Sequence, residues 1–182
     1  MHLPSILLCA VVSALSGVPT VVADIWSAIK ADSPTLIEKE LAQNPQLLNT
    51  RGPGGQTPLM HSVLSGKIEA LKLFISKGAD ATIGEKDGYT PMHGAGFQGR
   101  AEMVPLLAEY GLDPNEMHSD GYTPIHRACW GREQRHANTV KAFIEAGVDP
   151  RQRTRDGRGP LSLTQNAATK KVIRSAIEKA EL

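Results

Sequence analysis

Residues 87–93 read Asp-Gly-Tyr-Thr-Pro-Met-His, and residues 120–126 read Asp-Gly-Tyr-Thr-Pro-Ile-His. The second stretch lies 33 residues after the first, and a shorter copy, Gly-Gln-Thr-Pro-Leu at residues 55–59, precedes the first at the same spacing. A fixed period of about thirty residues is typical of stacked-repeat proteins, in which one unit cannot bury its apolar face alone. The period therefore predicts a solenoid of similar units.

Each copy of the motif has the chemistry of a tight turn followed by a helix. The Asp-Gly step favours a turn, because Gly accepts a positive φ without a Cβ clash. The Thr that follows is suited to cap a helix, and the Pro to occupy its first position, where a missing N–H has no consequence. We expect His93 and His126 to lie in the first turn of their helices and to hydrogen bond to the cap or to the neighbouring unit.

The complete pattern resembles the ankyrin repeat. The family pattern runs Gly-x-Thr-Pro-Leu-His-x-Ala-Ala, then Gly, then a second apolar helix and a closing Gly-Ala-Asp-x-Asn. The corresponding second helices are expected at residues 70–75, 103–107 and 140–144, and the closing turns begin at Gly78, Gly111 and Gly147. The resemblance implies an all-α repeat solenoid, made of helix-turn-helix ankyrin repeats joined by β-hairpin-like fingers.

The resemblance covers one ankyrin-repeat domain at residues 24–182. We expect an N-cap unit at 24–51, repeats at 52–84, 85–117 and 118–153, and a C-cap unit at 154–182. Two departures from the pattern have structural consequences. Pro105 falls inside a second helix and is expected to bend it or to remove a hydrogen bond. The third repeat is three residues longer, and its extra residues are expected between its two helices, within 131–138.

Residues 1–23 differ in kind from the rest of the chain. Residues 6–15 form an apolar core, and residues 21–23, Val-Val-Ala, are typical of a secretory cleavage site. We therefore expect a signal peptide cleaved after Ala23, and a mature protein that is secreted or lumenal. The apolar run is short for a bilayer core about 30 Å thick. The alternative is an uncleaved N-terminal segment that tethers the protein to a membrane.

The composition, with 41% hydrophobic and 21% charged residues, is that of a globular domain rather than a disordered chain. Cys9 belongs to the expected signal peptide, and Cys129 is expected to be a packed core thiol. The net charge of +1 is unevenly placed, because residues 24–120 hold 8 Lys/Arg and 13 Asp/Glu, whereas residues 121–182 hold 12 and 6. The basic half contains an arginine cluster: Arg127, Arg132, Arg135, Arg151, Arg153, Arg155 and Arg158.

The sequence contains no convincing catalytic, cofactor-binding or metal-binding motif. Residues 94–99 spell Gly-x-Gly-x-x-Gly, but the dinucleotide-binding motif needs a buried strand before it, and Thr-Pro-Met-His starts a helix instead. His93 and His126 are one repeat apart, too far to share a metal ion. No arrangement isolates a nucleophile with its base. We therefore expect no catalytic residue, no cofactor and no metal ion.

The positions expected to face the concave groove of an ankyrin solenoid carry large side chains. Leu64, Phe97 and Trp130 recur at intervals of 33 residues, and Tyr89 and Tyr122 occupy a second such position. Burying one aromatic ring removes about 150–250 Å² from water. We therefore expect these side chains to anchor a partner. The alternative is that long side chains of the next repeat cover the rings within the monomer.

These patterns predict a non-catalytic protein–protein interaction module that binds a protein partner on its concave ankyrin face. The partner is expected to present an acidic or apolar segment, and Arg127, Arg153 and Arg155 are expected to favour an acidic one. The protein is expected to be a monomer without a transmembrane segment in its mature form. The alternative is a polyanion binder, in which the arginine cluster holds nucleic acid, sulfated glycan or anionic lipid. A purely structural spacer is a third reading, and no residue pattern tests it.

Overall fold

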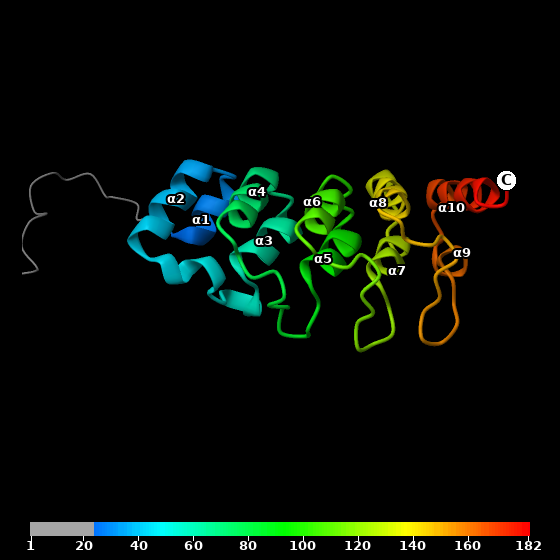
Figure 1. Cartoon of the computed structure of the whole chain (residues 1–182), viewed down its shortest axis with the longest axis horizontal. Coiled ribbons are helices and arrows are strands. Elements are labelled where there is room, and N and C mark those ends of the chain that lie inside the picture. Colours follow the sequence, from blue (N-terminus) through cyan, green and yellow to red (C-terminus); the bar gives the residue numbers. More distant parts are fainter. Residues whose placement is uncertain (1–23) are drawn as a thin grey trace, which may run out of the picture.

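The computed structural model describes residues 24–182, and in this part of the chain all regular elements are helices. The helices form two layers that advance along one axis from the N-terminal to the C-terminal end (Figure 1). The architecture is therefore an all-α repeat solenoid, as predicted. The expected signal peptide, with Cys9 and the cleavage site after Ala23, lies outside the described residues.

The inner layer holds the first helix of each unit, and the outer layer holds the second (Figure 1). In chain order the inner helices are α1 (Ile25–Lys30), α3 (Pro58–Ser65), α5 (Pro91–Gln98), α7 (Pro124–Cys129) and α9 (Pro160–Leu163). The outer helices are α2 (Pro34–Gln43), α4 (Ile68–Ser76), α6 (Met103–Glu109), α8 (Gln134–Glu145) and α10 (Ala167–Lys179). Two short 3₁₀ turns, η1 (Pro45–Asn49) and η2 (Pro53–Gly55), lie between α2 and α3.

The repeated motif forms the turn and the cap that its residue types predict. Thr57, Thr90 and Thr123 are the N-caps of α3, α5 and α7, and each is followed by Pro. The Nδ1 atom of His126 accepts a hydrogen bond from the backbone N–H of Thr123 at 3.2 Å. Its Nε2 atom is 3.0 Å from the carbonyl oxygen of Gln152, at the end of the same repeat. His126 therefore fixes the cap, as expected, and also ties the inner helix to the start of the following finger.

The fingers between units are turns closed by backbone hydrogen bonds rather than ladders of strands. The N–H of Glu85 donates to the carbonyl of Tyr89 at 3.0 Å, and the N–H of His118 donates to that of Tyr122 at 2.9 Å. The N–H of Arg155 donates to the carbonyl of Gly121 at 3.0 Å, so neighbouring fingers are also joined directly. This regular hydrogen bonding places the finger residues of each repeat beside one another.

Two local predictions from the sequence are wrong. Residues 134–138 do not lie between the helices of the third repeat, because α8 begins at Gln134 and has 12 residues, compared with 9 in α4 and 7 in α6. The extra residues lengthen this outer helix, which packs against α10. Pro105 neither bends nor weakens α6, because it is the third residue of that helix. In the first turn an N–H has no partner within the helix, so its loss has no consequence.

The core runs continuously between the two helical layers. It includes Ile29, Leu71, Leu107, Phe143 and Ile173, which are all fully buried and come from successive units. Cys129 is also fully buried, and burial raises the pKa of its thiol to about 12, so the thiol is inert at neutral pH. This agrees with the prediction of a packed core residue.

We predict that Gly96→Ala destabilises the protein by about 1–3 kcal/mol, because overpacking forces the backbone to shift. A Cβ atom at Gly96 would lie 2.2 Å from the carbonyl oxygen of Pro124, where α5 packs against α7. The control is Gly94→Ala in the same helix, whose Cβ would meet only side-chain ends of Leu64 and Met60 at 3.1 Å. Urea denaturation of both variants measures the difference, and equal stabilities would contradict the assignment of close packing to Gly96.

Candidate functional site

The inner helices present one register of side chains toward the groove. Phe97 is 56% exposed and Trp130 is 41% exposed, and Leu64 at the equivalent position of α3 is half-buried. The first-turn positions three residues earlier are His61, Gly94 and Arg127. The rings of Phe97 and Trp130 are therefore not covered by the next repeat. The alternative holds for the two tyrosines, because Arg127 of the next repeat lies over Tyr89 and Arg158 of the C-cap unit lies over Tyr122.

Arg127 is buried in the groove rather than free at its rim. Its side chain is 9% exposed, and its Nη2 atom pairs with Oδ2 of Asp120. The same nitrogen donates to the hydroxyl oxygen of Tyr89 at 2.8 Å, and that hydroxyl donates to Asp120 at 2.8 Å. A finger residue of one repeat is thereby tied to the finger and inner helix of the next. Because its charge is already compensated, Arg127 is not available as a free cation for an acidic partner.

Three aromatic rings surround the Arg127 guanidinium. Its central carbon lies 4.7 Å from the ring centroid of Tyr89, 5.0 Å from that of Tyr122 and 4.5 Å from that of Trp130. The rings of Tyr122 and Trp130 are also in edge contact, with centroids 5.0 Å apart. Cation–π contacts of this kind contribute about 0.5–2 kcal/mol each. The guanidinium therefore holds the predicted tyrosines and Trp130 in one rigid platform.

His118 and Asp120 support this platform from the finger. The His118 ring stacks on that of Tyr89 with centroids 3.8 Å apart, and its Nδ1 lies 3.0 Å from Oδ1 of Asp120. Partial burial alone would raise the pKa of Asp120. The hydrogen bonds that its carboxylate accepts, from Tyr89, His118, the backbone of Tyr122 and Arg127, instead hold that pKa well below its usual range. Asp120 is therefore ionised throughout the physiological range.

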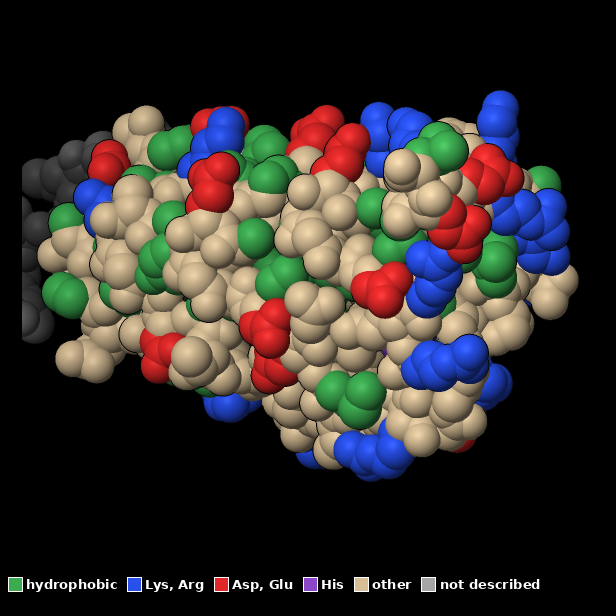
Figure 2. All heavy atoms as spheres, turned by 45° about the vertical axis from the view of Figure 1, so that its right-hand side comes forward, with side chains coloured by type: hydrophobic (Ala, Val, Ile, Leu, Met, Phe, Trp, Pro, Cys, Tyr) green, Lys and Arg blue, Asp and Glu red, His purple; other side chains and the backbone are tan. Residues whose placement is uncertain are grey.

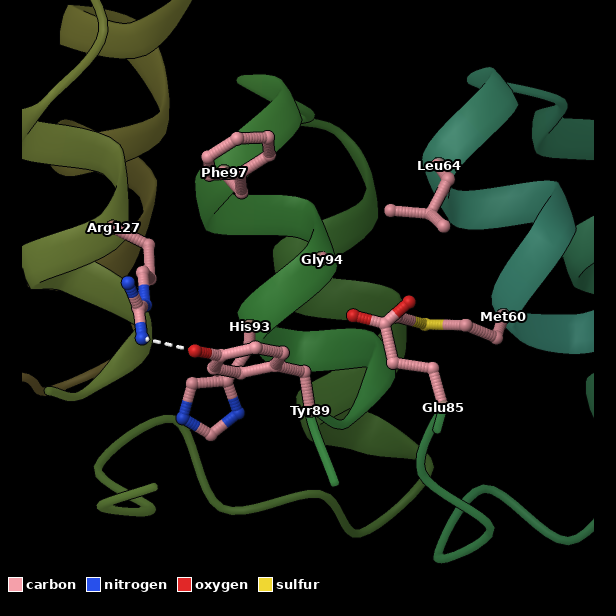
Figure 3. A pocket seen from close by; sticks show the side chains of 8 residues that line it. All are labelled: Met60, Leu64, Glu85, Tyr89, His93, Gly94, Phe97 and Arg127. Carbon is pink, nitrogen blue, oxygen red and sulfur yellow. Dashed lines mark hydrogen bonds between the residues drawn. The ribbon is translucent and has the colours of Figure 1, made fainter. Parts of the chain in front are cut away.

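A hollow of about 180 Å³ opens beside the platform, between α3 and α5. Phe97 and Leu64 face it from opposite sides, and the Glu85 side chain reaches in from the finger (Figure 3). The lining residues are Met60, Leu64, Glu85, Tyr89, His93, Gly94, Phe97 and Arg127. The hollow exists because Gly94 has no side chain, at the position that Arg127 occupies one repeat later.

The hollow combines a neutral floor with one carboxylate. Burial lowers the pKa of His93 to about 4, with the neighbouring charge of His118 as a smaller cause, so its ring is neutral at pH 7. Burial raises the pKa of Glu85, and repulsion from Asp87 adds to the shift. Among residues 24–182, no cationic side chain forms an ion pair with Glu85. The carboxylate is the only acidic group that lines this hollow.

The structure brings most of the predicted site residues together. Leu64, Tyr89, Phe97 and Arg127 line the hollow, and Tyr122 and Trp130 contact Arg127 next to it. The remaining two are placed apart on the last finger. There Arg153 donates to the carbonyl of Gly157 at 2.6 Å, and Arg155 donates to that of Ser119 at 2.7 Å.

The sequence analysis did not assign several residues of this region to the site, among them Met60, Glu85, Gly94, His118 and Asp120. Asp120 was interpreted only as part of a turn, although it lies seven residues before Arg127 in the repeated motif. Met60 replaces the histidine found at this position in the other repeats, and Gly94 replaces a large polar residue. Glu85 gave no signal, because a single carboxylate on a finger cannot be distinguished by pattern from a solvated one. Their roles depend on side-chain placement between units.

Other kinds of site receive no support from residues 24–182. In this part of the chain no three His, Cys, Asp or Glu side chains are grouped to hold a metal ion. The Gly-x-Gly-x-x-Gly stretch lies within α5 and its C-cap, not at a turn between a strand and a helix. None of the described helices has the length and apolar character needed to cross a bilayer.

The family model described as ankyrin repeats (3 copies) matches residues 25–118 and residues 85–154 of this chain. Together these matches cover most of the sequence, in the same region where the helical units are observed. The chain therefore belongs to the ankyrin-repeat family. Ankyrin repeats generally mediate protein–protein interactions and are generally non-catalytic, and the match indicates no enzyme family.

The chain is also similar over a short region to curated ankyrin proteins. It is 43% identical over 42 residues to Notch-regulated ankyrin repeat-containing protein B of Danio rerio, which is 23% of this chain and 38% of that protein. It shares the same identity over 42 residues with the Notch-regulated ankyrin repeat-containing protein of Homo sapiens, covering 37% of that protein. The chain thus spans less than two fifths of the length of these relatives.

We predict that Asp120→Asn destabilises the protein by about 1–3 kcal/mol, because it leaves the buried Arg127 guanidinium without its counter-charge. The depressed pKa of Asp120 means that its contribution is complete above its unfolded pKa, near 4, and is lost as the pH falls further. Urea denaturation at pH 7 and at pH 3 tests this. The role of the ion pair would be contradicted if the difference in the free energy of unfolding between Asp120→Asn and the wild type were as large at pH 3 as at pH 7.

Proposed function

We propose that this protein is a non-catalytic interaction module that binds a protein partner on its concave face. The observation that carries the proposal is the exposed Phe97 ring beside an apolar hollow, next to a platform of rigidly held aromatic rings. Phe97 and Trp130 are large apolar side chains that stay exposed at equivalent positions of successive repeats. Grouped on one surface, they are typical of an interaction site.

Ring burial accounts for the affinity that such a groove needs. Covering one aromatic side chain contributes about 4–6 kcal/mol gross, from about 150–250 Å² at about 25 cal/mol/Å². Phe97 and Trp130 are already partly buried, so each contributes less than this, and association has its own entropic cost. Two rings and the hollow still favour a specific complex, because the platform is preorganised by Arg127 and loses little side-chain freedom on binding.

The charged side chains are distributed unevenly along the domain. The N-terminal part of the domain is acidic and the C-terminal part is basic, and on the face seen in Figure 2 the Lys and Arg side chains gather toward the C-terminal end. The positive charges of Arg153 and Arg155 are not compensated by a carboxylate among residues 24–182, because both side chains donate to backbone carbonyls. We propose that the partner segment places its acidic residues over this last finger, which speeds association more than it strengthens the complex.

The polyanion alternative is less well supported by the arginine contacts. Arg127, Arg135, Arg151 and Arg158 each pair with a carboxylate of this chain, which leaves fewer free cations than the sequence suggests. Binding of a polyanion weakens steeply as salt rises, because counterions are released on association. A complex anchored by aromatic rings changes little over the same range.

We predict that Phe97→Ala lowers the affinity for the partner at least about tenfold while the free energy of unfolding changes by less than about 1 kcal/mol. The test is affinity purification of partners with the wild-type chain, followed by titration of each identified protein at low and high salt. Trp130→Ala is also expected to weaken binding, but it is a less clean probe, because the Trp130 ring covers Arg127.

The matched control is Met117→Ala, which removes an apolar side chain that is 43% exposed and does not line the hollow. Partners that bind Phe97→Ala and the wild type equally would contradict the concave-face proposal. The polyanion alternative would be favoured instead if the affinity of the complex falls steeply as the salt concentration rises and is the same for Phe97→Ala and the wild type.

A further inference from the structure

We propose that the hollow between α3 and α5 receives one lysine or arginine side chain of the bound protein. Its aliphatic stem would pack against the apolar walls, and its positive head would pair with the carboxylate of Glu85. This inference rests on the proposed function, because the side chain belongs to a partner segment that lies in the groove. It assigns to that segment a basic residue at the level of the second repeat.

The size of the hollow fits one side chain. Its volume of about 180 Å³ is below the roughly 300–1,000 Å³ that small-molecule and cofactor sites usually have. It is also not enclosed within the core, because the exposed Phe97 ring forms one of its walls, so a residue of a docked chain can enter from outside. The space therefore suits an anchor residue of a protein rather than a free metabolite.

The walls suit the stem of a long side chain. Leu64 and Phe97 face the hollow from opposite sides, and Met60 lies at its base (Figure 3). Lysine and arginine bury their methylene groups along such apolar surfaces while the charged head stays at a polar site. The exposed ring of Phe97 adds a face for a cation, and a guanidinium stacks on such a ring well.

The Glu85 carboxylate selects for positive charge. It lies within the hollow, between Tyr89 and the Met60 side chain (Figure 3). No ion pair with a cation of residues 24–182 compensates it, and its other polar neighbours are the side chain of Gln56 and, at longer range, Asp87 and His118. A partly desolvated carboxylate without a counter-ion is unfavourable, and pairing with a cation relieves that penalty. An apolar guest would bury the charge further, and an acidic guest would be repelled.

The nearby Arg127 does not prevent entry of a second cation. Its guanidinium is paired with Asp120 and hydrogen bonded to Tyr89, so its charge is compensated within the platform. The floor beneath the hollow is the neutral ring of His93. The uncompensated charge that the hollow presents is therefore negative, although the C-terminal end of the same groove is basic.

The experiment is selection of binders from a random dodecapeptide library displayed on phage, against residues 24–182 of the wild-type chain. We expect the enriched peptides to share one Lys or Arg and to lose binding to Phe97→Ala. Glu85→Gln, which keeps shape and removes the charge, should lower their affinity about tenfold, the value of one charge-assisted hydrogen bond. Replacing the shared basic residue by norleucine should have the same effect, and the two changes together little more than either alone.

The control is Glu109→Gln, which removes one exposed carboxylate from the outer helix α6 and should leave binding unchanged. Glu85→Gln should also leave the thermal midpoint equal or higher, because the partly buried charge does not stabilise the free protein. A purely structural role for Glu85 would lower that midpoint.

Two results would overturn the inference in different ways. In the first, the enriched peptides need Phe97 for binding but share an apolar or acidic residue, and their affinity does not change in Glu85→Gln. This result would contradict the proposed basic anchor and leave the concave-face function intact. If no enriched peptide depends on Phe97, the proposed function fails, and the basic anchor fails with it.

Discussion

The ion pair between the buried Arg127 and the partly exposed Asp120 is the interaction on which the groove depends. Asp120 belongs to a finger, Arg127 to an inner helix, and the Tyr89 hydroxyl, which joins them, to the finger of the preceding repeat. Removing either charge would leave the other partly desolvated, which is why such pairs are strongly coupled to their surroundings. The pair also fixes the guanidinium among Tyr89, Tyr122 and Trp130. The shape of the proposed binding surface is thus set by electrostatics as much as by the packing of apolar residues.

The sequence predicted the fold well because ankyrin architecture is encoded locally. The turn, the Thr cap and the following Pro act within one unit, and the 33-residue period then dictates how units stack. The prediction failed where an element had no repeated counterpart. The extra residues of the third repeat lengthen α8, which nothing in their composition required, and Pro105 lies close enough to the start of α6 to be harmless. Helix boundaries depend on where the neighbouring unit offers packing, and that information is not local.

The candidate site was predicted only in part, for a similar reason. Register placed Leu64, Phe97 and Trp130 on one surface, because equivalent positions of a solenoid face the same way. The position of a residue within the repeat does not show whether its charge is compensated by an ion pair. Arg127 was expected to favour an acidic partner segment but is buried and paired with Asp120, whereas Glu85 gave no signal and forms no ion pair within residues 24–182. Whether a charged side chain is paired depends on contacts between residues distant in the chain, and a single sequence does not reveal them.

The hollow in the groove is created by the absence of a side chain at Gly94. Every amino-acid replacement of glycine adds atoms, so each coding change at this position begins to fill the space. The helix would tolerate the smallest of these changes, since a methyl group there meets only flexible side-chain ends. If the hollow receives a partner side chain as proposed, a single substitution at Gly94 would remove that recognition without loss of the folded protein. Related chains that differ at this position are expected to share the architecture and to differ in what they bind.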